Sequence, residues 1–274
     1  MIEIGEIVPL GRQMNDVLTG KRVVECARGN TPHKWVFFND AFDERALKAS
    51  GALVGGVIGT GKCLYTTLEY GSRLMFGELG GRVTYHAPGE ELPAKHHFVL
   101  RLDDGSAVTV AVQGWGFIAF LEADETPPEW AASGEDPLAP EFTLDRFTGI
   151  WREHPERESC TMKAFLVSRP RIAGIGNGYA QEILFQARIR PDRRMRDVSD
   201  AEAGGLYQVL RTTLAEAARL GGRDAERDLY GRPGRYVVSV DKRAASKPCR
   251  RCGGEIVGVK LLGGTSYYCE GCQT

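Results

Sequence analysis

The stretch PCRRCGGEIVGVKLLGGTSYYCEGCQ (residues 248–273) carries four cysteines in two Cys-x2-Cys pairs separated by sixteen residues. A Cys-x2-Cys turn can place two sulfur atoms on one metal ion, and two such turns on a hairpin complete a tetrahedral Zn²⁺ site. Disulfides are the alternative, but three further cysteines stand alone and we expect no export signal. We therefore predict one structural Zn²⁺ as cofactor, held by Cys249, Cys252, Cys269 and Cys272.

A second informative stretch is RIAGIGNGYAQEILFQARIRP, residues 171–191. Its glycine-rich turn, Gly174 to Asn177, runs directly into an amphipathic helix. Backbone N–H groups and the positive end of the helix dipole attract anions at such a turn. The two glycines would let a phosphate backbone approach, and Asn177 adds a side-chain donor. Taken alone, an ordinary helical hairpin explains the pattern as well.

The rest of the chain divides where its hydrophobic period changes. Residues 1–6 alternate apolar and acidic and are expected to form a strand, and residues 8–20 a helix. Nine β-rich runs follow between residues 22 and 122, broken by glycine-containing turns. After a Pro/Ala/acid-rich stretch the period becomes helical, at residues 144–151, 160–168, 177–189 and 200–220.

These patterns predict an α+β fold in which a two-layer β-sandwich with flanking helices precedes a helical region and a four-cysteine zinc-finger hairpin. A barrel is the alternative for the β-rich half. The expected parts are a β-sandwich domain at 1–124, a linker at 125–140, a helix–two-turn–helix domain at 141–244 and the zinc finger at 245–274.

The net charge of −1 hides a strong asymmetry. Residues 1–151 hold 13 Lys and Arg against 21 Asp and Glu, whereas residues 152–274 hold 22 against 15. A basic C-terminal half favours an anionic partner, although a solvated arginine-rich surface would give the same counts. No apolar stretch is long enough to cross a bilayer, so we expect a cytoplasmic protein without a membrane partner.

In this order, the β-rich half, the GIGNGY…E turn and the terminal PCxxCGxxI…YYCxxCQ motif resemble the bacterial formamidopyrimidine-DNA glycosylase/endonuclease VIII family. The resemblance covers essentially the whole chain. It implies a monomer that acts on double-stranded DNA carrying a damaged base or an abasic site, in the cytoplasm at the nucleoid. Family members excise oxidised bases and nick the abasic site, using an N-terminal amine that normally belongs to a proline.

The first residues of the chain resemble the N-terminal catalytic motif of the family. The family begins Pro-Glu-Leu-Pro-Glu, and the matching residues here are Ile2, Glu3, Ile4, Gly5 and Glu6. Glu3 therefore takes the position of the general acid/base. Ile2 replaces the nucleophilic proline and should keep Met1 in place, which moves the free amine to Met1. The implied catalytic residues are Met1, Ile2 and Glu3.

The resemblance also implies DNA contacts in both halves. Lys62 in GTGKCL matches a phosphate-binding lysine, and Asn177 with Gly176 matches the phosphate clamp. Leu79 in GELGGR and Trp115 in QGWGF fall on loops that wedge into the duplex, with ordinary core or turn roles as the alternative. We expect residues 221–236 to form a mobile loop over the flipped base.

The finger tip departs from the family pattern. An arginine that binds phosphate is replaced by Gly264, whose backbone N–H could still hold a phosphate.

Three hypotheses on the function follow from the matches and departures together. The chain is a DNA glycosylase and abasic-site lyase, or a catalytically silent damaged-DNA binding protein, or a glycosylase without lyase activity in which Glu3 activates water. The presence of Glu3, Lys62 and Asn177 favours catalysis, whereas Ile2 and Gly264 favour binding alone.

Overall fold

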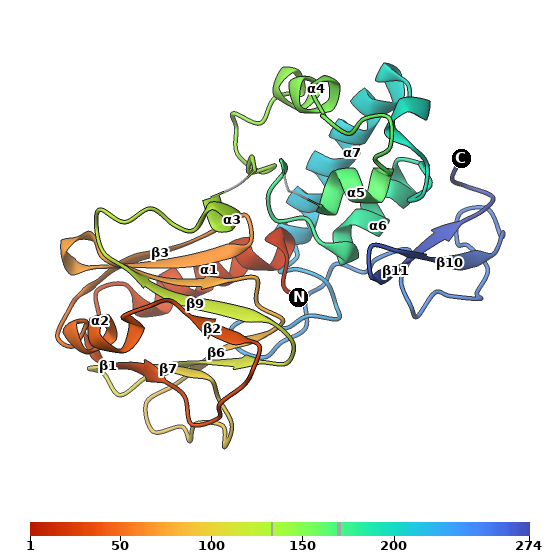
Figure 1. The fold of residues 1–274 in the computed structure, drawn as a ribbon. Coiled ribbons are helices and arrows are strands. Elements are labelled where there is room, and N and C mark those ends of the chain that lie inside the picture. The colour runs from red at the N-terminus through yellow and green to blue at the C-terminus, as the bar shows by residue number, and fades with distance from the viewer. Residues whose placement is uncertain (133, 169–170) are drawn as a thin grey trace. The chain divides into compact units, whose positions relative to one another are not determined.

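The computed structural model describes residues 1–132, 134–168 and 171–274, and it separates into two compact units (Figure 1). The first contains Met1–Ala132 and Ala218–Arg235. The second contains the described residues of Ser133–Ala217 together with Tyr236–Thr274. The chain therefore leaves the first unit, returns to it for residues 218–235 and leaves again. The domain ranges expected from the sequence do not include this return and place the finger apart from the helices.

The first unit is a two-layer β-sandwich, which confirms the predicted fold. One sheet has the strand order β1-β7-β8-β6 and the other β2-β9-β5-β4-β3; only the β2–β9 pair is parallel. Buried side chains from both sheets, such as Phe76 and Phe98, pack with α1 and α2 into one core. The strands are β1 (Val23–Arg28), β2 (Val36–Phe38), β3 (Val54–Thr60), β4 (Cys63–Leu68), β5 (Arg73–Gly77), β6 (Gly81–His86), β7 (Phe98–Leu102), β8 (Ala107–Val112) and β9 (Gly116–Leu121).

Helix α1, Ile4–Leu18, confirms the helix predicted at residues 8–20 but begins within the strand predicted at residues 1–6, so the strand prediction is wrong. Glu3 is the N-cap, and a capping box links it to Glu6: the Glu6 carboxylate accepts a hydrogen bond from the Glu3 backbone N–H at 2.9 Å. Apolar residues at helical spacing then continue into the core. The short alternation at residues 1–6 could not distinguish a strand from this helix start.

Two glycines let α1 lie directly against the sheet. A Cβ atom on Gly11 would lie 2.4 Å from the Gly59 backbone nitrogen, and one on Gly59 would lie 2.2 Å from the carbonyl oxygen of Ile7. The backbones of α1 and β3 therefore approach too closely for any side chain at either position. Short helices also flank this unit: α2 (Phe42–Lys48), η1 (Glu69–Gly71) and α3 (Glu129–Ala132).

The second unit is helical and ends in a hairpin. Its helices are α4 (Leu144–Arg152), α5 (Met162–Val167), α6 (Asn177–Gln186), η2 (Met195–Asp197) and α7 (Asp200–Arg219), the last of which runs into the first unit. All four predicted helices are present. Thr143 and Thr161 cap α4 and α5 by accepting hydrogen bonds from backbone N–H groups. Among the described residues, none of the helices has the length and apolar character needed to span a membrane.

The hairpin of β10 (Ile256–Leu261) and β11 (Gly264–Cys269) packs on α6. Its small core contains Phe185, Ile256 and Cys269. Arg251 donates a hydrogen bond to the carbonyl oxygen of Phe185 at 3.0 Å, and Gln273 donates to that of Ile189 at 2.8 Å. These bonds attach the finger to the helical region within one unit.

Candidate active site

The first two residues have opposite environments. The side chain of Ile2 is buried in the sandwich core at 2% exposure, and its backbone N–H donates to the carbonyl oxygen of Leu79 at 2.9 Å. Met1 is 55% exposed. Ile2 therefore anchors the start of the chain, and Met1 stands at the surface.

Beside this end, the guanidinium of Arg223 lies among buried carboxylates. Its Nη1 atom is 3.2 Å from Glu3 Oε1, and its Nη2 and Nε atoms are 3.0 and 3.1 Å from the two oxygens of Glu6. Nη2 also donates to the carbonyl oxygen of Met1 at 3.2 Å. The Glu3 and Glu6 side chains are only 5% and 2% exposed, and Arg223 only 10%. Buried charges need partners of this kind, so Arg223 balances both acids.

A third carboxylate completes this group, which we call the Arg223 cluster: Glu3, Glu6, Arg223, Glu226 and the Met1 α-amine. Glu226 Oε1 lies 3.6 Å from Arg223 Nη2, and its side chain is 25% exposed. Burial raises the pKa of Glu226 above its ordinary value, while the positive charges of Arg223 and the Met1 amine act in the opposite direction.

Arg223 and Glu226 belong to the segment that the sequence assigned to a mobile loop over the base. Instead, the segment packs on the first unit: Gln13 in α1 donates to Asp228 at 3.1 Å, and Tyr85 N–H donates to the carbonyl oxygen of Leu229 at 3.0 Å. Gly222, with φ +90°, lies so close to Glu6 that an added Cβ would be 2.6 Å from Glu6 Cγ. Sequence reasoning missed Arg223. The available signal was the acid pair at residues 3 and 6, which needs a cation if both are buried.

The two loops predicted as wedges lie side by side. Gly80 N–H donates to the carbonyl oxygen of Trp115 at 2.7 Å, next to Leu79. Leu79 itself is 0% exposed and belongs to the core, which does not fit a side chain that wedges into a duplex. Trp115 is 42% exposed and does fit. Two aromatic rings that the sequence analysis missed accompany it: Phe37 with a centroid distance of 4.4 Å and Trp35 at 6.1 Å.

Lys62 lies in the turn between β3 and β4. Its Nζ atom is 3.2 Å from Glu78 Oε1, and its side chain is 16% exposed. The neighbouring Gly61 has a φ of +55°, which favours glycine in this turn. Lys62 is therefore an ion-paired cation at the tip of a hairpin, and a phosphate oxygen would have to compete with Glu78 for it.

In the second unit, the glycine-rich turn predicted to bind phosphate, Gly174 to Asn177, contacts the finger hairpin. Gly176 is the N-cap of α6 and Asn177 its exposed first residue. Asn177 Nδ2 donates to the carbonyl oxygen of Thr265 at 3.1 Å, and Ser266 Oγ lies 3.4 Å from Asn177 Oδ1. The structure thus brings Asn177 and the finger strand that begins at Gly264 together.

A lysine that the sequence analysis missed lies beneath the finger tip. Lys163 in α5 is 3% exposed and donates from Nζ to the carbonyl oxygen of Leu261 at 2.8 Å. A Cβ atom on Gly264 would lie 3.7 Å from this Nζ. Burial lowers the pKa of Lys163. The amino group of Lys163 thus lies close to the position where Gly264 offers no side chain.

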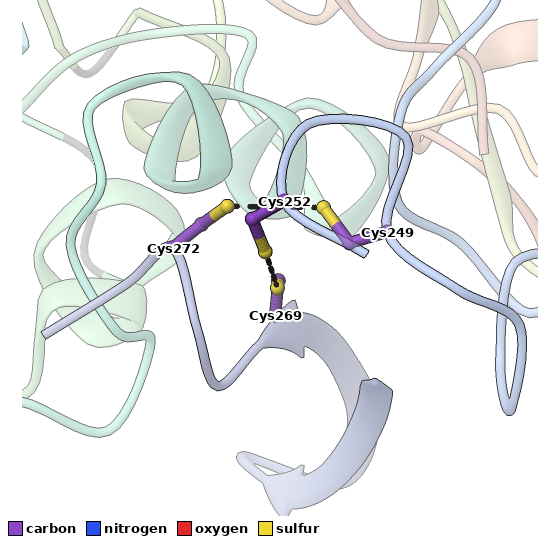
Figure 2. Close-up of side chains that lie close together, drawn as sticks. All are labelled: Cys249, Cys252, Cys269 and Cys272. Carbon is purple, nitrogen blue, oxygen red and sulfur yellow. Dashed lines mark hydrogen bonds between the residues drawn. The ribbon is translucent and has the colours of Figure 1, made fainter. Parts of the chain in front are cut away.

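The four finger cysteines point toward one another (Figure 2). Their sulfur atoms all lie within 4.8 Å of one another, with Cys249 and Cys272 at 3.8 Å and Cys252 and Cys269 at 3.5 Å. Tetrahedral Zn–S bonds of about 2.3 Å separate sulfurs by about 3.8 Å, whereas a disulfide needs about 2.05 Å. The group therefore has the donors and spacing of a metal site.

Comparison with known proteins agrees with this architecture. Residues 133–227 match the formamidopyrimidine-DNA glycosylase H2TH domain. The formamidopyrimidine-DNA glycosylase of Thermomicrobium roseum is 31% identical over 299 residues, covering 100% of this chain and 99% of that protein. That of Desulfitobacterium hafniense (strain DSM 10664 / DCB-2) is 28% identical, with both chains covered completely.

Solved structures show the same fold. The Lactococcus lactis Fpg (MutM) in complex with DNA containing N7-benzyl-Fapy-dG has a TM-score of 0.86 at 23% identity, and the complex of that protein with abasic-site DNA has 0.86 at 21%. Each comparison covers 99% of both chains. The resemblance inferred from the motifs is confirmed, and the chain belongs to the formamidopyrimidine-DNA glycosylase family.

Proposed function

We propose that the protein is a DNA repair glycosylase with abasic-site lyase activity, acting as a monomer in the cytoplasm on double-stranded DNA that carries a damaged base or an abasic site. Family membership supports this reaction class, because the full-length relatives are named formamidopyrimidine-DNA glycosylase. The Lactococcus lactis relative binds DNA with a damaged base or an abasic site. One observation of this chain carries the proposal: an exposed first residue directly beside a buried glutamate cluster.

The Met1 α-amine is the proposed nucleophile. α-Amines as a class titrate at about pH 7.7–8.0, so a useful fraction is neutral at cellular pH and can attack C1′ of the sugar. A primary amine forms a Schiff base as a proline amine does. Exposure of Met1 leaves room for the sugar, while burial of Ile2 fixes the backbone that carries the amine.

Glu3 is the proposed general acid/base. Its carboxylate lies next to the first residue and is oriented by Arg223 at 3.2 Å and by its place at the start of α1. In this role it exchanges protons with the sugar ring and the departing base, a contribution of about 10²–10⁴-fold in rate.

DNA is proposed to be held by residues of both units. Lys62 would bind a phosphate, and Trp115 would fill the space left by a flipped base, since apolar wedges offset the cost of unstacking. Asn177 with the N-terminal N–H groups of α6, beginning at Gly176, would hold a second phosphate. The backbone at Gly264 would add a contact, with the Lys163 charge nearby.

Zn²⁺ is the proposed occupant of the four-cysteine site. Four thiolates at tetrahedral spacing suit this ion and leave no position open for a substrate. Its contribution is therefore to hold the hairpin strands in place against α6, which positions the finger residues near Asn177.

A second candidate is a DNA-binding protein that recognises abasic sites without chemistry. One observation favours it: the ion pair with Arg223 holds the Glu3 carboxylate in place, and that carboxylate must exchange protons if the protein is an enzyme. In that case Lys62, Trp115 and Asn177 would keep their roles, and Met1 would not react.

Borohydride trapping on a duplex with one abasic site separates the two candidates. The glycosylase-lyase is expected to become covalently linked to the DNA, with the adduct on residue 1 by peptide mass analysis. Glu3→Gln should suppress excision of a damaged base while duplex binding stays nearly unchanged, because the amide keeps the shape and loses proton transfer. A protein that binds the abasic duplex tightly and never traps would establish the second candidate.

A further inference from the structure

Glu226 stands beside the residue that carries the proposed nucleophile. The same guanidinium nitrogen, Nη2 of Arg223, is 3.2 Å from the carbonyl oxygen of Met1 and 3.6 Å from Oε1 of Glu226. Among the three carboxylates of the Arg223 cluster, Glu226 is the most exposed, at 25% against 5% for Glu3 and 2% for Glu6. It is therefore the carboxylate most accessible from the surface on which Met1 stands.

Resting on the proposed function, we propose that Glu226 is the base that takes a proton from the Met1 α-ammonium and returns it during Schiff-base formation. The other two acids are already engaged. Glu6 accepts hydrogen bonds from the backbone N–H groups of Glu3 and Arg223 as well as from the guanidinium. Glu3 caps α1 and pairs with Arg223.

The surroundings of Glu226 suit a proton carrier. Burial is the largest cause that raises its pKa, and the negative charges of Glu6 and Glu3 act in the same direction, against the positive charges of Arg223 and the Met1 amine. A base works best when its pKa approaches the working pH, because it must both accept and release the proton. An ordinary exposed glutamate would accept a proton from an ammonium less readily.

The proton and charge balance closes without a further reagent. The Glu226 carboxylate takes one proton from the ammonium, and the neutral amine forms a bond to the C1′ aldehyde carbon of the open abasic sugar. The aldehyde oxygen takes one of the two protons of that nitrogen and becomes the hydroxyl of a neutral carbinolamine. Glu226 then gives its proton to that hydroxyl, which leaves as water, while the nitrogen lone pair forms the C=N bond and the nitrogen gains the positive charge of the protonated Schiff base. Glu226 ends as the carboxylate with which it began.

The test measures the rate of borohydride trapping on a preformed abasic-site duplex between about pH 5.5 and 9. Glu226→Gln should slow trapping by about 10²-fold at the acidic end. The two rates should converge at alkaline pH, where water removes the proton from the amine. Glu226→Asp should restore part of the acidic rate. The matched control is Glu91→Gln, which removes the same charge from an exposed position of the same unit.

The direction of the effect distinguishes a base from a simple nearby charge. A negative charge stabilises the ammonium, so neutralising Glu226 would release more free amine and speed trapping if electrostatics were its only contribution. Slower trapping by Glu226→Gln, with unchanged affinity for a duplex carrying a tetrahydrofuran abasic analogue, supports the proposal. Equal or faster trapping at every pH overturns it while leaving the proposed function intact. A wild-type protein that never traps overturns both.

Discussion

At the scale of single residues, Arg223 balances the buried negative charge beside the proposed nucleophile. Three carboxylates and two cations meet in the Arg223 cluster, and the guanidinium contacts every acid in it. A buried ion pair adds little stability compared with well-packed apolar residues, but removing one partner leaves a buried charge uncompensated. Arg223 is therefore expected to stabilise the first unit as well as to order the site.

Arg223→Met should lower the free energy of unfolding by about 3–5 kcal/mol, because Glu3 and Glu6 would stay buried without their cation. Urea unfolding followed by circular dichroism measures the change. Arg82→Met is the control: Arg82 is exposed on β6, and its loss should change stability by less than about 0.5 kcal/mol. Equal stability of both variants would show that the acids do not depend on Arg223.

Lys62→Ala should weaken binding to damaged and undamaged duplexes alike, because a phosphate contact positions DNA without reading its sequence. The slope of log affinity against log salt concentration should become shallower by about one, since one fewer counterion is released. Titrations at several salt concentrations measure the slope. The folded protein should be hardly affected, because a partly exposed pair with Glu78 contributes at most about 1 kcal/mol. An unchanged slope would mean that Lys62 does not touch the DNA backbone.

At the scale of elements, the finger hairpin depends on its cysteines. Its apolar core is small, so a metal ion held by the four cysteines would supply much of the energy that orders β10 and β11. The hairpin in turn accepts the hydrogen bond from Asn177. Loss of the metal would therefore also weaken the hydrogen bond that orients Asn177 in the proposed phosphate clamp.

Cys272→Ser should lose the one equivalent of zinc expected for wild type and expose the amides of β10 and β11 to hydrogen exchange. The sandwich should keep its protection, because the finger belongs to the other unit. Metal analysis and exchange mass spectrometry measure both effects. Cys160→Ser is the control, since Cys160 lies outside the metal cluster. A zinc-free protein with a fully protected hairpin would contradict the prediction.

The elements were largely predictable, and their long-range pairings were not. Nine β-rich runs, several of them with period two, predicted the nine strands of the sandwich, and Cys-x2-Cys spacing predicted the cysteine cluster. The start of α1 was missed because six residues are too few to separate two periods. Trp35 was missed because its approach to Trp115 arises from the parallel β2–β9 pairing, which local sequence does not encode. Arg223 lies 217 residues from Glu6, and no local pattern joins them.

At the scale of the whole molecule, the acidic N-terminal and basic C-terminal halves of the sequence do not coincide with the two compact units. The first unit recruits residues 218–235, which bring the arginine that neutralises its acids. The second unit keeps the phosphate turn, the buried Lys163 and the finger. The residues of the proposed chemistry therefore belong to the first unit, and several of the residues proposed to bind DNA belong to the second. Each unit is built from two segments of the chain.

This return of residues 218–235 has a consequence for biosynthesis. The ribosome synthesises all strands of the sandwich before Arg223 leaves its exit tunnel. Until then, the carboxylates of Glu3 and Glu6 stay exposed to water because their cation has not yet been made. The N-terminal turn of helix α1 therefore cannot reach its final packing until most of the protein has been translated. Contacts of such sequence separation are slow to form and leave apolar surface exposed meanwhile. The nascent chain is therefore expected to depend on chaperones until the C-terminal third emerges, although each finished unit is compact.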